Sequence, residues 1–432
     1  MEKTIGELLS AALPSLAAAL SLILMGLCGV KLLVRLTRVL RGEETADSLP
    51  NGKKCVLRWG RAPVRTLFMV AAVALLSRIL IYALGYAMYR GLGVGTDGFV
   101  QSFMPLWRHW DASHYVNIAR DGYVATGDER LRLVFFPLYP LLMRMVAPLT
   151  GGDVFLAGTV ISLFCASLAT ALVYDLAYMH FGPRSAALGV AYFLMSPMSV
   201  FLGCVYTEAL FLCLTLGAVC LIRRSHPWLA ALCGMLSALT RMPGVIVAGF
   251  FIIALLARVA QGEIRRAILP CAGQVLMVFA GLFIYWGINY AVTGDPLMYM
   301  TYQRENWYQE PGTFWQSTAN TMHYFLNTFG DEDWFFTWGF QLLCMFYVYA
   351  LLAFGQDRLP FDLAAYSFVY VCVVLSPTWL LSGPRYLYAL CALPILQARL
   401  YRGKAVHALA LALSGVLLIV FVFGYVIAVE VL

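Results

Sequence analysis

The residues best suited to chemistry lie in one short polar and aromatic stretch, Trp107–Tyr115. Asp111 is flanked there by two tryptophans and two histidines. Only 12% of the 432 residues are charged and the mean hydropathy is +0.77, so polar groups are scarce throughout the chain. Carboxylates that persist in such a chain usually pair with another charge or take part in chemistry. We therefore expect Asp111 to be catalytic; the alternative is an acid on a helix that pairs with Arg108 or His114.

Further acids and arginines lie in the segments that connect the apolar runs. Arg241 and Arg385 each stand in a turn that contains Pro and Gly, where a guanidinium either binds phosphate or snorkels to lipid headgroups. Glu208 follows a turn, so it either joins a site or stabilises the start of its own helix. Separate stretches of chain thus deliver charged groups to one interface: Asp111, His114, Glu208, Arg241, Asp295, Arg304, Glu305 and Arg385.

The elements that position these groups are membrane helices. Hydrophobic residues make up 61% of the chain, and apolar runs of about 20 residues recur to its end. The short alternating segments of a transmembrane barrel do not occur. The sequence therefore predicts an all-α polytopic membrane protein with about twelve transmembrane helices, at approximately 12–34, 66–89, 154–178, 185–203, 206–222, 228–240, 243–258, 268–291, 335–354, 361–380, 384–399 and 406–430.

The distribution of Lys and Arg predicts the orientation of these spans. Basic residues fill the hydrophilic segment 31–65, which the positive-inside rule makes cytoplasmic. Alternating from there leaves two long loops outside the cytoplasm, 90–134 after the second span and 292–334 after the eighth. Segment 135–149 is apolar but contains three prolines, and we expect it to be interfacial or re-entrant rather than a crossing helix.

Two units and several exclusions follow from the same patterns. Residues 1–65 are expected to form an extra N-terminal transmembrane helix and a basic cytoplasmic linker, and residues 66–432 the main membrane bundle. The net charge of +7 is spread over many loops, so it does not indicate a nucleic-acid partner. The eleven cysteines lie mostly in apolar spans without a C-x-x-C pair, so we expect neither a disulfide framework nor a zinc site.

Several short motifs, in one order along the chain, resemble those of a known family. They are Trp110–Tyr115 with Ile118-Ala119 and Gly122-Tyr123, then Phe135–Pro140, Ser196-Pro197, Tyr206–Glu208, Thr240–Gly244, Gly294–Leu297 with Gln303 and Trp307, and Pro384–Tyr386. With these motifs the chain resembles the PIG-V-like mannosyltransferases, a branch of the GT-C superfamily of polytopic glycosyltransferases. The first span and its basic linker are an addition before the usual start of that family, and position 242 is Met where the family often has a different residue before its glycine.

The resemblance implies a GT-C-like fold and an inverting transfer of mannose from a polyprenyl-phosphate-mannose donor on the non-cytoplasmic face. Asp111 would be the catalytic base for the acceptor hydroxyl, and Arg241 and Arg385 would bind the donor phosphate. His114 would orient Asp111 or bind sugar hydroxyls. The remaining candidates for contacts with the sugar or the acceptor are Trp110, Tyr139, Tyr206, Glu208, Gln303 and Tyr386.

The implied partners are the polyprenyl-phosphate sugar donor, a lipid or glycan acceptor, and membrane lipids. A lipid phosphate leaves as a stable anion, so the reaction needs no general acid. We expect no cofactor and no metal ligands; Asp111 and Glu208 suit Mg²⁺ or Mn²⁺, but the reaction does not require either ion. The acceptor stays open.

Two other functions remain as alternatives. A GT-C transferase of another polyprenyl-phosphate sugar, such as arabinose, glucose or galacturonic acid, would use a similar loop acid. A lipid or sugar transporter would place its charges near the membrane midplane on broken helices and often show repeated halves, and neither sign is present. The compact chain without a retrieval signal favours a bacterial plasma membrane, with the active site facing outward.

Overall fold

The part of the chain that the computed structural model describes, residues 5–47, 60–93, 97–331 and 334–428, is helical and contains no strand. Seven of its helical segments are long and apolar enough to cross a membrane. The predicted all-α polytopic membrane fold is therefore confirmed. The seven segments are α1 (Ile5–Leu40), α2 (Val64–Gly91), α6 (Val154–Phe181), η4 (Met242–Val247) with α10 (Ala248–Ala260), α11 (Ile264–Thr293), η5 (Trp334–Gly339) with α14 (Phe340–Gly355) and η6 (Gln356–Arg358), and α18 (Lys404–Val426).

The other predicted spans form shorter helices. An α-helix rises about 1.5 Å per residue, so about 20 residues are needed to cross the apolar core of a bilayer. These helices have 6 to 16 residues, and five of the six carry a proline at, just before or just after their first residue, where it favours a helix start and cannot continue the preceding helix. They are α7 (Pro183–Met195), α8 (Glu208–Arg223), α9 (Pro227–Ala238), α15 (Phe361–Val374), α16 (Gly383–Tyr388) and α17 (Leu393–Leu400). The count of about twelve spans stays a prediction.

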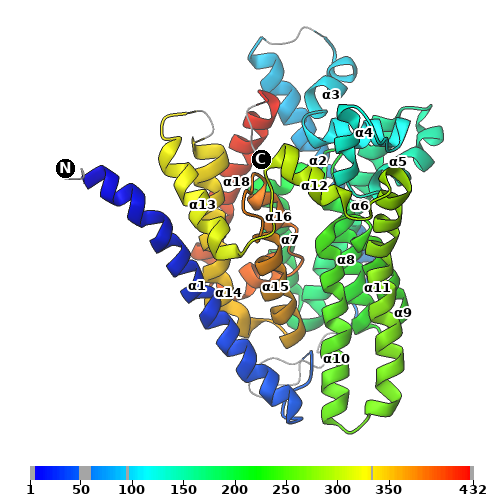
Figure 1. Ribbon diagram of the computed structural model, residues 1–432, viewed down its shortest axis with the longest axis vertical. Coiled ribbons are helices and arrows are strands. Elements are labelled where there is room, and N and C mark those ends of the chain that lie inside the picture. Colours follow the sequence, from blue (N-terminus) through cyan, green and yellow to red (C-terminus); the bar gives the residue numbers. More distant parts are fainter. Residues whose placement is uncertain (1–4, 48–59, 94–96, 332–333, 429–432) are drawn as a thin grey trace.

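Both long predicted loops are largely helical and lie at the same end of the molecule. The first contains α3 (Phe99–Trp107), α4 (Asp111–Asp121) and η1 (Asp128–Val134), and the second contains α12 (Met298–Trp307) and α13 (Phe314–Asn327). Figure 1 shows α3, α4 and α12 at one end and the turn between α10 and α11 at the other. The assignment of the first end to the non-cytoplasmic side stays a prediction.

The proline-rich segment is bent, as its composition predicts. η1 meets α5 (Leu138–Val146) and η2 (Ala147–Thr150) at 105°, across the break that contains Pro137. Leu141, Met145 and Leu149 are exposed on the outer side of this segment. Such a row of apolar side chains suits the membrane interface.

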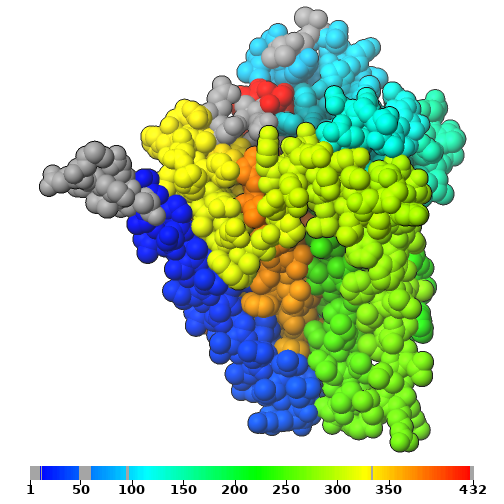
Figure 2. All heavy atoms as spheres, viewed as in Figure 1, coloured from blue at the N-terminus to red at the C-terminus, as the bar shows by residue number. Residues whose placement is uncertain are grey.

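The N-terminal helix is attached to the main bundle along its length. α1 packs against α13, α14 and α15, and Figure 2 shows it as a ridge along one side of the molecule. Near its end, Lys31 Nζ donates to the Ala353 carbonyl at 2.8 Å, and Arg35 Nη1 donates to the Leu359 carbonyl at 3.2 Å. Most of the basic linker, 48–59, lies outside the described residues. The division at residue 65 stays a prediction.

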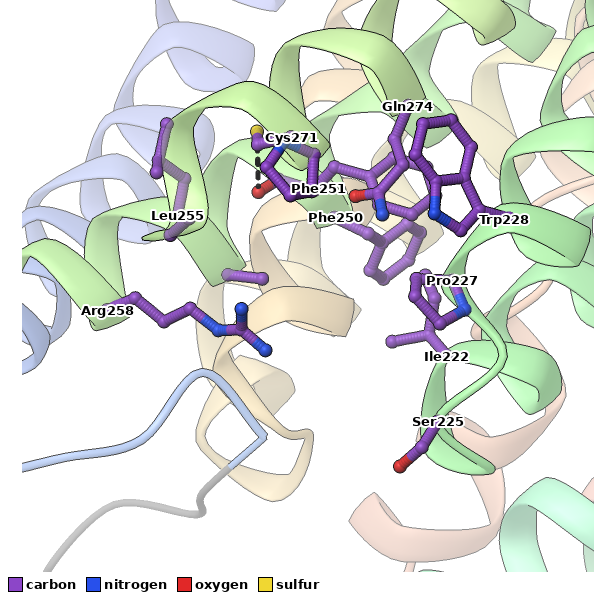
Figure 3. A pocket seen from close by; sticks show the side chains of 13 residues that line it. Ile222, Ser225, Pro227, Trp228, Phe250, Phe251, Leu255, Arg258, Cys271 and Gln274 are labelled. Atoms are coloured by element: carbon purple, nitrogen blue, oxygen red, sulfur yellow. Dashed lines mark hydrogen bonds between the residues drawn. The ribbon is translucent and has the colours of Figure 1, made fainter. Parts of the chain in front are cut away.

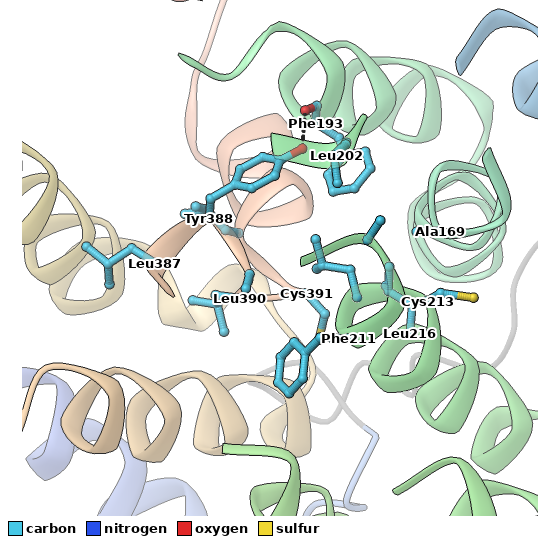
Figure 4. Close-up of a cluster of buried hydrophobic side chains, with 14 of the residues drawn as sticks. Ala169, Phe193, Leu202, Phe211, Cys213, Leu216, Leu387, Tyr388, Leu390 and Cys391 are labelled. Carbon is cyan, nitrogen blue, oxygen red and sulfur yellow. Dashed lines mark hydrogen bonds between the residues drawn. The ribbon is translucent and has the colours of Figure 1, made fainter. Parts of the chain in front are cut away.

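A buried cluster holds α16 in place. Tyr388, in the last turn of α16, donates from its hydroxyl to the Phe193 carbonyl of α7 at 2.8 Å. Figure 4 shows that apolar side chains of α6, α7, η3 (Pro197–Leu202), α8 and α16 meet around this bond, among them Ala169, Phe193, Leu202, Phe211, Leu216 and Leu390. Packing of this kind fixes the position of α16, and with it the direction in which Arg385, three residues before Tyr388, points.

Arg78 has partners that the sequence did not indicate. It lies inside α2 and is 1% exposed, and it donates to the backbone carbonyls of Ser199 and Leu194. Those carbonyls belong to the break between α7 and η3, where helical hydrogen bonding stops and carbonyl groups are left over. A buried guanidinium thus stabilises an interrupted helix.

The turn that carries Arg241 depends on Gly244. A Cβ at this glycine would lie 2.3 Å from the backbone nitrogen of Ala238 and 2.3 Å from the carbonyl carbon of Ser237, so η4 sits directly on α9. We expect Gly244→Ala to lower the free energy of unfolding by about 1–3 kcal/mol, because the backbone rather than a side chain must move. The measurement is the thermal unfolding midpoint of the purified protein in detergent.

Gly249→Ala is the matched control, since a Cβ there meets nothing within 4 Å. An unchanged midpoint in Gly244→Ala, equal to that of Gly249→Ala, would contradict the close packing of η4 on α9.

Candidate active site

Four charged side chains from distant parts of the chain meet at the end of the molecule that carries α4. Asp111 is the first residue of α4, and Glu208 is the first residue of α8. Arg241 immediately precedes η4, and Arg385 lies in α16. Two carboxylates and two guanidiniums balance in formal charge, so the cluster as a whole is neutral.

One oxygen of Glu208 holds both arginines. Glu208 Oε1 accepts hydrogen bonds from Arg385 Nε at 3.0 Å, Arg385 Nη2 at 2.8 Å and Arg241 Nη1 at 3.1 Å. The side chain is 0% exposed, so these charge-assisted bonds form away from water and are strong. The second oxygen, Oε2, is buried and has no hydrogen-bond partner in the described part of the chain.

Arg385 links this buried acid to Asp111. Its Nη2 also donates to Asp111 Oδ2 at 3.1 Å. The guanidinium carbon lies 4.5 Å from the ring centre of Tyr206 and 4.8 Å from that of Phe201, and Arg241 lies in the same way 4.7 Å from the ring of Tyr386. Aromatic faces attract such cations and restrict their motion.

Asp111 is the member of the cluster that reaches solvent. Its side chain is 30% exposed, against 14% for Arg241, 3% for Arg385 and 0% for Glu208. It also stands in the first turn of a helix, where a negative charge is stabilised by the unpaired backbone amides. Of the two carboxylates in the cluster, Asp111 is therefore the one that a substrate hydroxyl can approach.

The turn before Asp111 is strained and firmly held. Trp110 has φ +46°, a conformation that costs about 1–3 kcal/mol for a residue other than glycine and persists where neighbouring contacts impose it. The Tyr206 hydroxyl donates to the His109 carbonyl at 3.0 Å, and the Trp110 ring packs edge-on against Tyr425 with centroids 5.2 Å apart. These contacts fix the position at which α4 begins.

His114 lies one turn after Asp111 and joins an aromatic row. Its ring stacks on Phe135 at 4.7 Å, and Phe135 contacts Trp307 of α12 at 6.0 Å. Burial lowers the pKa of His114, although the Asp111 carboxylate opposes this effect, and the lowering favours the neutral imidazole. A neutral imidazole is able to accept a hydrogen bond from a sugar hydroxyl. Gln303 lies one turn before Trp307 on the same helix.

The structure separates the other predicted residues into two groups. Tyr206 and Tyr386 support the two arginines, as described. Tyr139 lies in the packing behind α4: it is 0% exposed, and its hydroxyl is bonded to the Gly158 carbonyl at 2.9 Å and to Ser162 Oγ at 2.7 Å. Its predicted contact with substrate is untested.

Three charged residues of the predicted interface lie apart from the cluster. Arg304 Nε pairs with Glu310 at 2.9 Å, and Glu305 pairs with Arg130 at 3.6 Å. Asp295 Oδ1 accepts from the backbone nitrogen of Leu297 at 2.8 Å. These groups stabilise the segment around α12 instead.

Sequence reasoning missed two aromatic residues of the site. Phe201 lies under Arg385, and Tyr425, from the end of α18, contacts His109 and Trp110 and donates to the Trp107 carbonyl at 3.1 Å. Phe201 stands five residues before the motif Tyr206–Glu208, which was the available signal. A lone tyrosine in the last apolar helix gives none.

The described residues contain no group of three or more His, Cys, Asp and Glu that could hold a metal ion. Asp111 and Glu208, the two oxygen ligands considered above, both bind Arg385. The independence of metals stays a prediction.

Comparison with known proteins identifies relatives of part of this chain. The family described as Mannosyltransferase (PIG-V) matches residues 94–308, a range that includes Asp111, Glu208 and Arg241 but not Arg385. The chain is 30% identical over 166 residues to GPI alpha-1,6-mannosyltransferase 2 of Cricetulus griseus and to that of Mus musculus, with 36% of this chain and 33% of each relative covered. The human protein of that name is 27% identical over 164 residues, covering 36% of this chain and 32% of the relative.

The chain thus aligns with about a third of the length of these relatives. No solved structure gives a significant match. The relatives come from mammals, so they do not support the predicted bacterial plasma membrane.

The geometry predicts different structural roles for the two acids. Glu208→Gln leaves two buried guanidiniums without their shared anion, and losing one partner of a buried ion pair costs about 3–5 kcal/mol. Asp111→Asn removes a charge that is 30% exposed and leaves the Glu208–Arg385 pair intact. We expect Glu208→Gln to lower the thermal unfolding midpoint markedly more than Asp111→Asn does. Equal midpoints would show that Glu208 does not organise the cluster.

Proposed function

We propose that the chain transfers mannose from a polyprenyl-phosphate-mannose donor to an acceptor hydroxyl at the non-cytoplasmic membrane face. The match of residues 94–308 to the PIG-V mannosyltransferase family supports this proposal. The observation that carries this proposal is the pairing of one accessible carboxylate, Asp111, with a buried arginine, Arg385. The first suits a base and the second suits an anion site.

The reaction requires one proton acceptor. The acceptor oxygen attacks the anomeric carbon of mannose and forms the new C–O bond, while the bond from that carbon to the phosphate oxygen breaks. The hydroxyl proton passes to the Asp111 carboxylate, and the lipid phosphate leaves with the bonding electron pair. Attack opposite the leaving group inverts the anomeric carbon, so a β-linked donor gives an α-mannoside.

The two arginines fit the departing phosphate. Glu208 engages Nε and Nη2 of Arg385 and Nη1 of Arg241. In the part of the chain described, Nη1 of Arg385 and Nη2 of Arg241 make no hydrogen bond, so each guanidinium keeps a donor for a further anion. Preorganised positive charge of this kind stabilises a developing phosphate charge without reorganisation during the reaction.

The names of the relatives suggest which acceptor to test first. They are named for a GPI alpha-1,6-mannosyl transfer, and an α-mannoside is the product that inversion of a β-linked donor gives. A GPI-type glycolipid is therefore the first acceptor to test, beside a crude lipid extract that samples others. His114, Gln303 and Trp110 are proposed to contact the sugar or the acceptor.

The proposal is tested with purified protein, polyprenyl-phosphate-[¹⁴C]mannose and a lipid acceptor. Asp111→Asn is expected to keep the native unfolding midpoint within a small margin and to lose about 10²–10⁴-fold in transfer rate, because general-base help is removed. Asp128→Asn is the matched control, since Asp128 lies at the same end of the molecule with a fully exposed side chain. Native turnover by Asp111→Asn would remove Asp111 from the mechanism.

The phosphate role predicts a specific kinetic change. Arg241→Lys keeps the charge beside Glu208 but loses the planar fork, so the loss of one charge-assisted bond should raise the KM for the donor by about tenfold and leave the KM for the acceptor nearly unchanged. Arg304→Lys, on the exposed pair with Glu310, is the control. An equal rise in both KM values would place Arg241 outside the donor site.

A further inference from the structure

A concave site lies at the opposite end of the bundle from Asp111. A cavity of about 360 Å³ opens among the start of α9, α10 and α11. Figure 3 shows its walls, with Trp228 and Pro227 on one side, Leu255 and Arg258 on the other and Phe250 at the back. Figure 1 places the turn between α10 and α11 at the end remote from α4.

The walls of this cavity are apolar and open to the membrane. Only 33% of the most apolar stretch in each of the segments Met242–Ala260 and Ile264–Thr293 is buried, so both present side chains to lipid. The Trp228 ring lies on Gly273, where a Cβ would come within 2.8 Å of it, and the residue is still 50% exposed. A space of this character takes hydrocarbon rather than water.

Gln274 supplies a polar group deep inside this apolar space. It lies ten residues into α11, about 15 Å along the helix axis, and it is 8% exposed. The described part of the chain offers its carboxamide no hydrogen-bond partner, and Figure 3 shows the group pointing between Phe250 and Trp228. An amide in an apolar surrounding is more stable when it has a hydrogen-bond partner, so this group suits a ligand that offers one.

Positive charge stands at the mouth of the cavity. Arg258 lies in the last turn of α10, and Arg265 and Arg266 lie in the first turn of α11. Arg258 lines the cavity and has no acidic partner among the described residues. The sequence predicts that this end of the molecule is cytoplasmic. It would then lie in the cytoplasmic leaflet of the membrane, where anionic lipids gather around basic residues.

We propose that this cavity binds an anionic glycerophospholipid of the adjacent leaflet. Its phosphate pairs with Arg258, its ester region meets the Gln274 carboxamide, and one acyl chain lies along Phe250 and Trp228. The ligand thus matches the three kinds of group that line the cavity, which are a cation at the mouth, an amide and apolar walls. This site is remote from Asp111 and independent of the proposed transfer reaction.

Trp228 provides a local readout of occupancy. The protein is reconstituted into phosphatidylcholine vesicles that contain a small mole fraction of phosphatidylglycerol, and the acyl chains of one lipid or the other carry bromine. Subtracting the signal of Trp228→Phe isolates this residue from the other tryptophans. We expect brominated phosphatidylglycerol to quench Trp228 with an apparent affinity about fivefold higher than brominated phosphatidylcholine does.

Three variants decide the outcome. Arg258→Gln should abolish the preference for phosphatidylglycerol, and Ala254→Phe, which fills the cavity and keeps every charge, should abolish it as well. Arg266→Gln, a neighbouring exposed arginine that does not line the cavity, should retain the preference. Equal quenching by both lipids, or a preference that survives Arg258→Gln or Ala254→Phe, overturns the proposal.

Discussion

The site depends on one buried oxygen atom. Glu208 Oε1 accepts hydrogen bonds from both Arg241 and Arg385. The three segments that carry these residues, which are far apart in the chain, are therefore held together at one point. Without that anion, two guanidiniums would stand unpaired in an apolar surrounding, at a cost of several kcal/mol. Because the acid neutralises half of their combined charge, the arginines can stay buried and still offer donors to the donor phosphate.

The two acids are placed by helix starts. Asp111 and Glu208 are each the first residue of a helix, where free backbone amides favour a negative charge. The strained Trp110 fixes the start of α4, and the contact of Tyr388 with Phe193 fixes α16 and with it Arg385. Backbone strain at Trp110 and aromatic packing around Tyr388 thus determine where a few polar atoms lie.

Arginines elsewhere in the bundle are also paired with acceptors. Arg223 is paired with both oxygens of Asp362 at 2.7 Å, Arg224 is paired with Asp175, and Arg78 is bonded to carbonyls at a helix break. Each of these three cations has an acceptor, as a low-dielectric environment requires.

The sequence by itself determined the helical membrane class, the polar stretch around Asp111 and the set of acids and arginines at one end, because hydropathy and charge are local properties of a chain. It also indicated the bend near Pro137, since proline interrupts a helix wherever it occurs. Only the tertiary structure decided that Glu208, Arg241, Arg385 and Asp111 are in contact while Asp295, Arg304 and Glu305 pair elsewhere. It likewise decided that Tyr139 is buried and that Tyr425 supports the site. Such contacts join residues up to 318 positions apart, and they follow from how helices pack, which no spacing along the chain records.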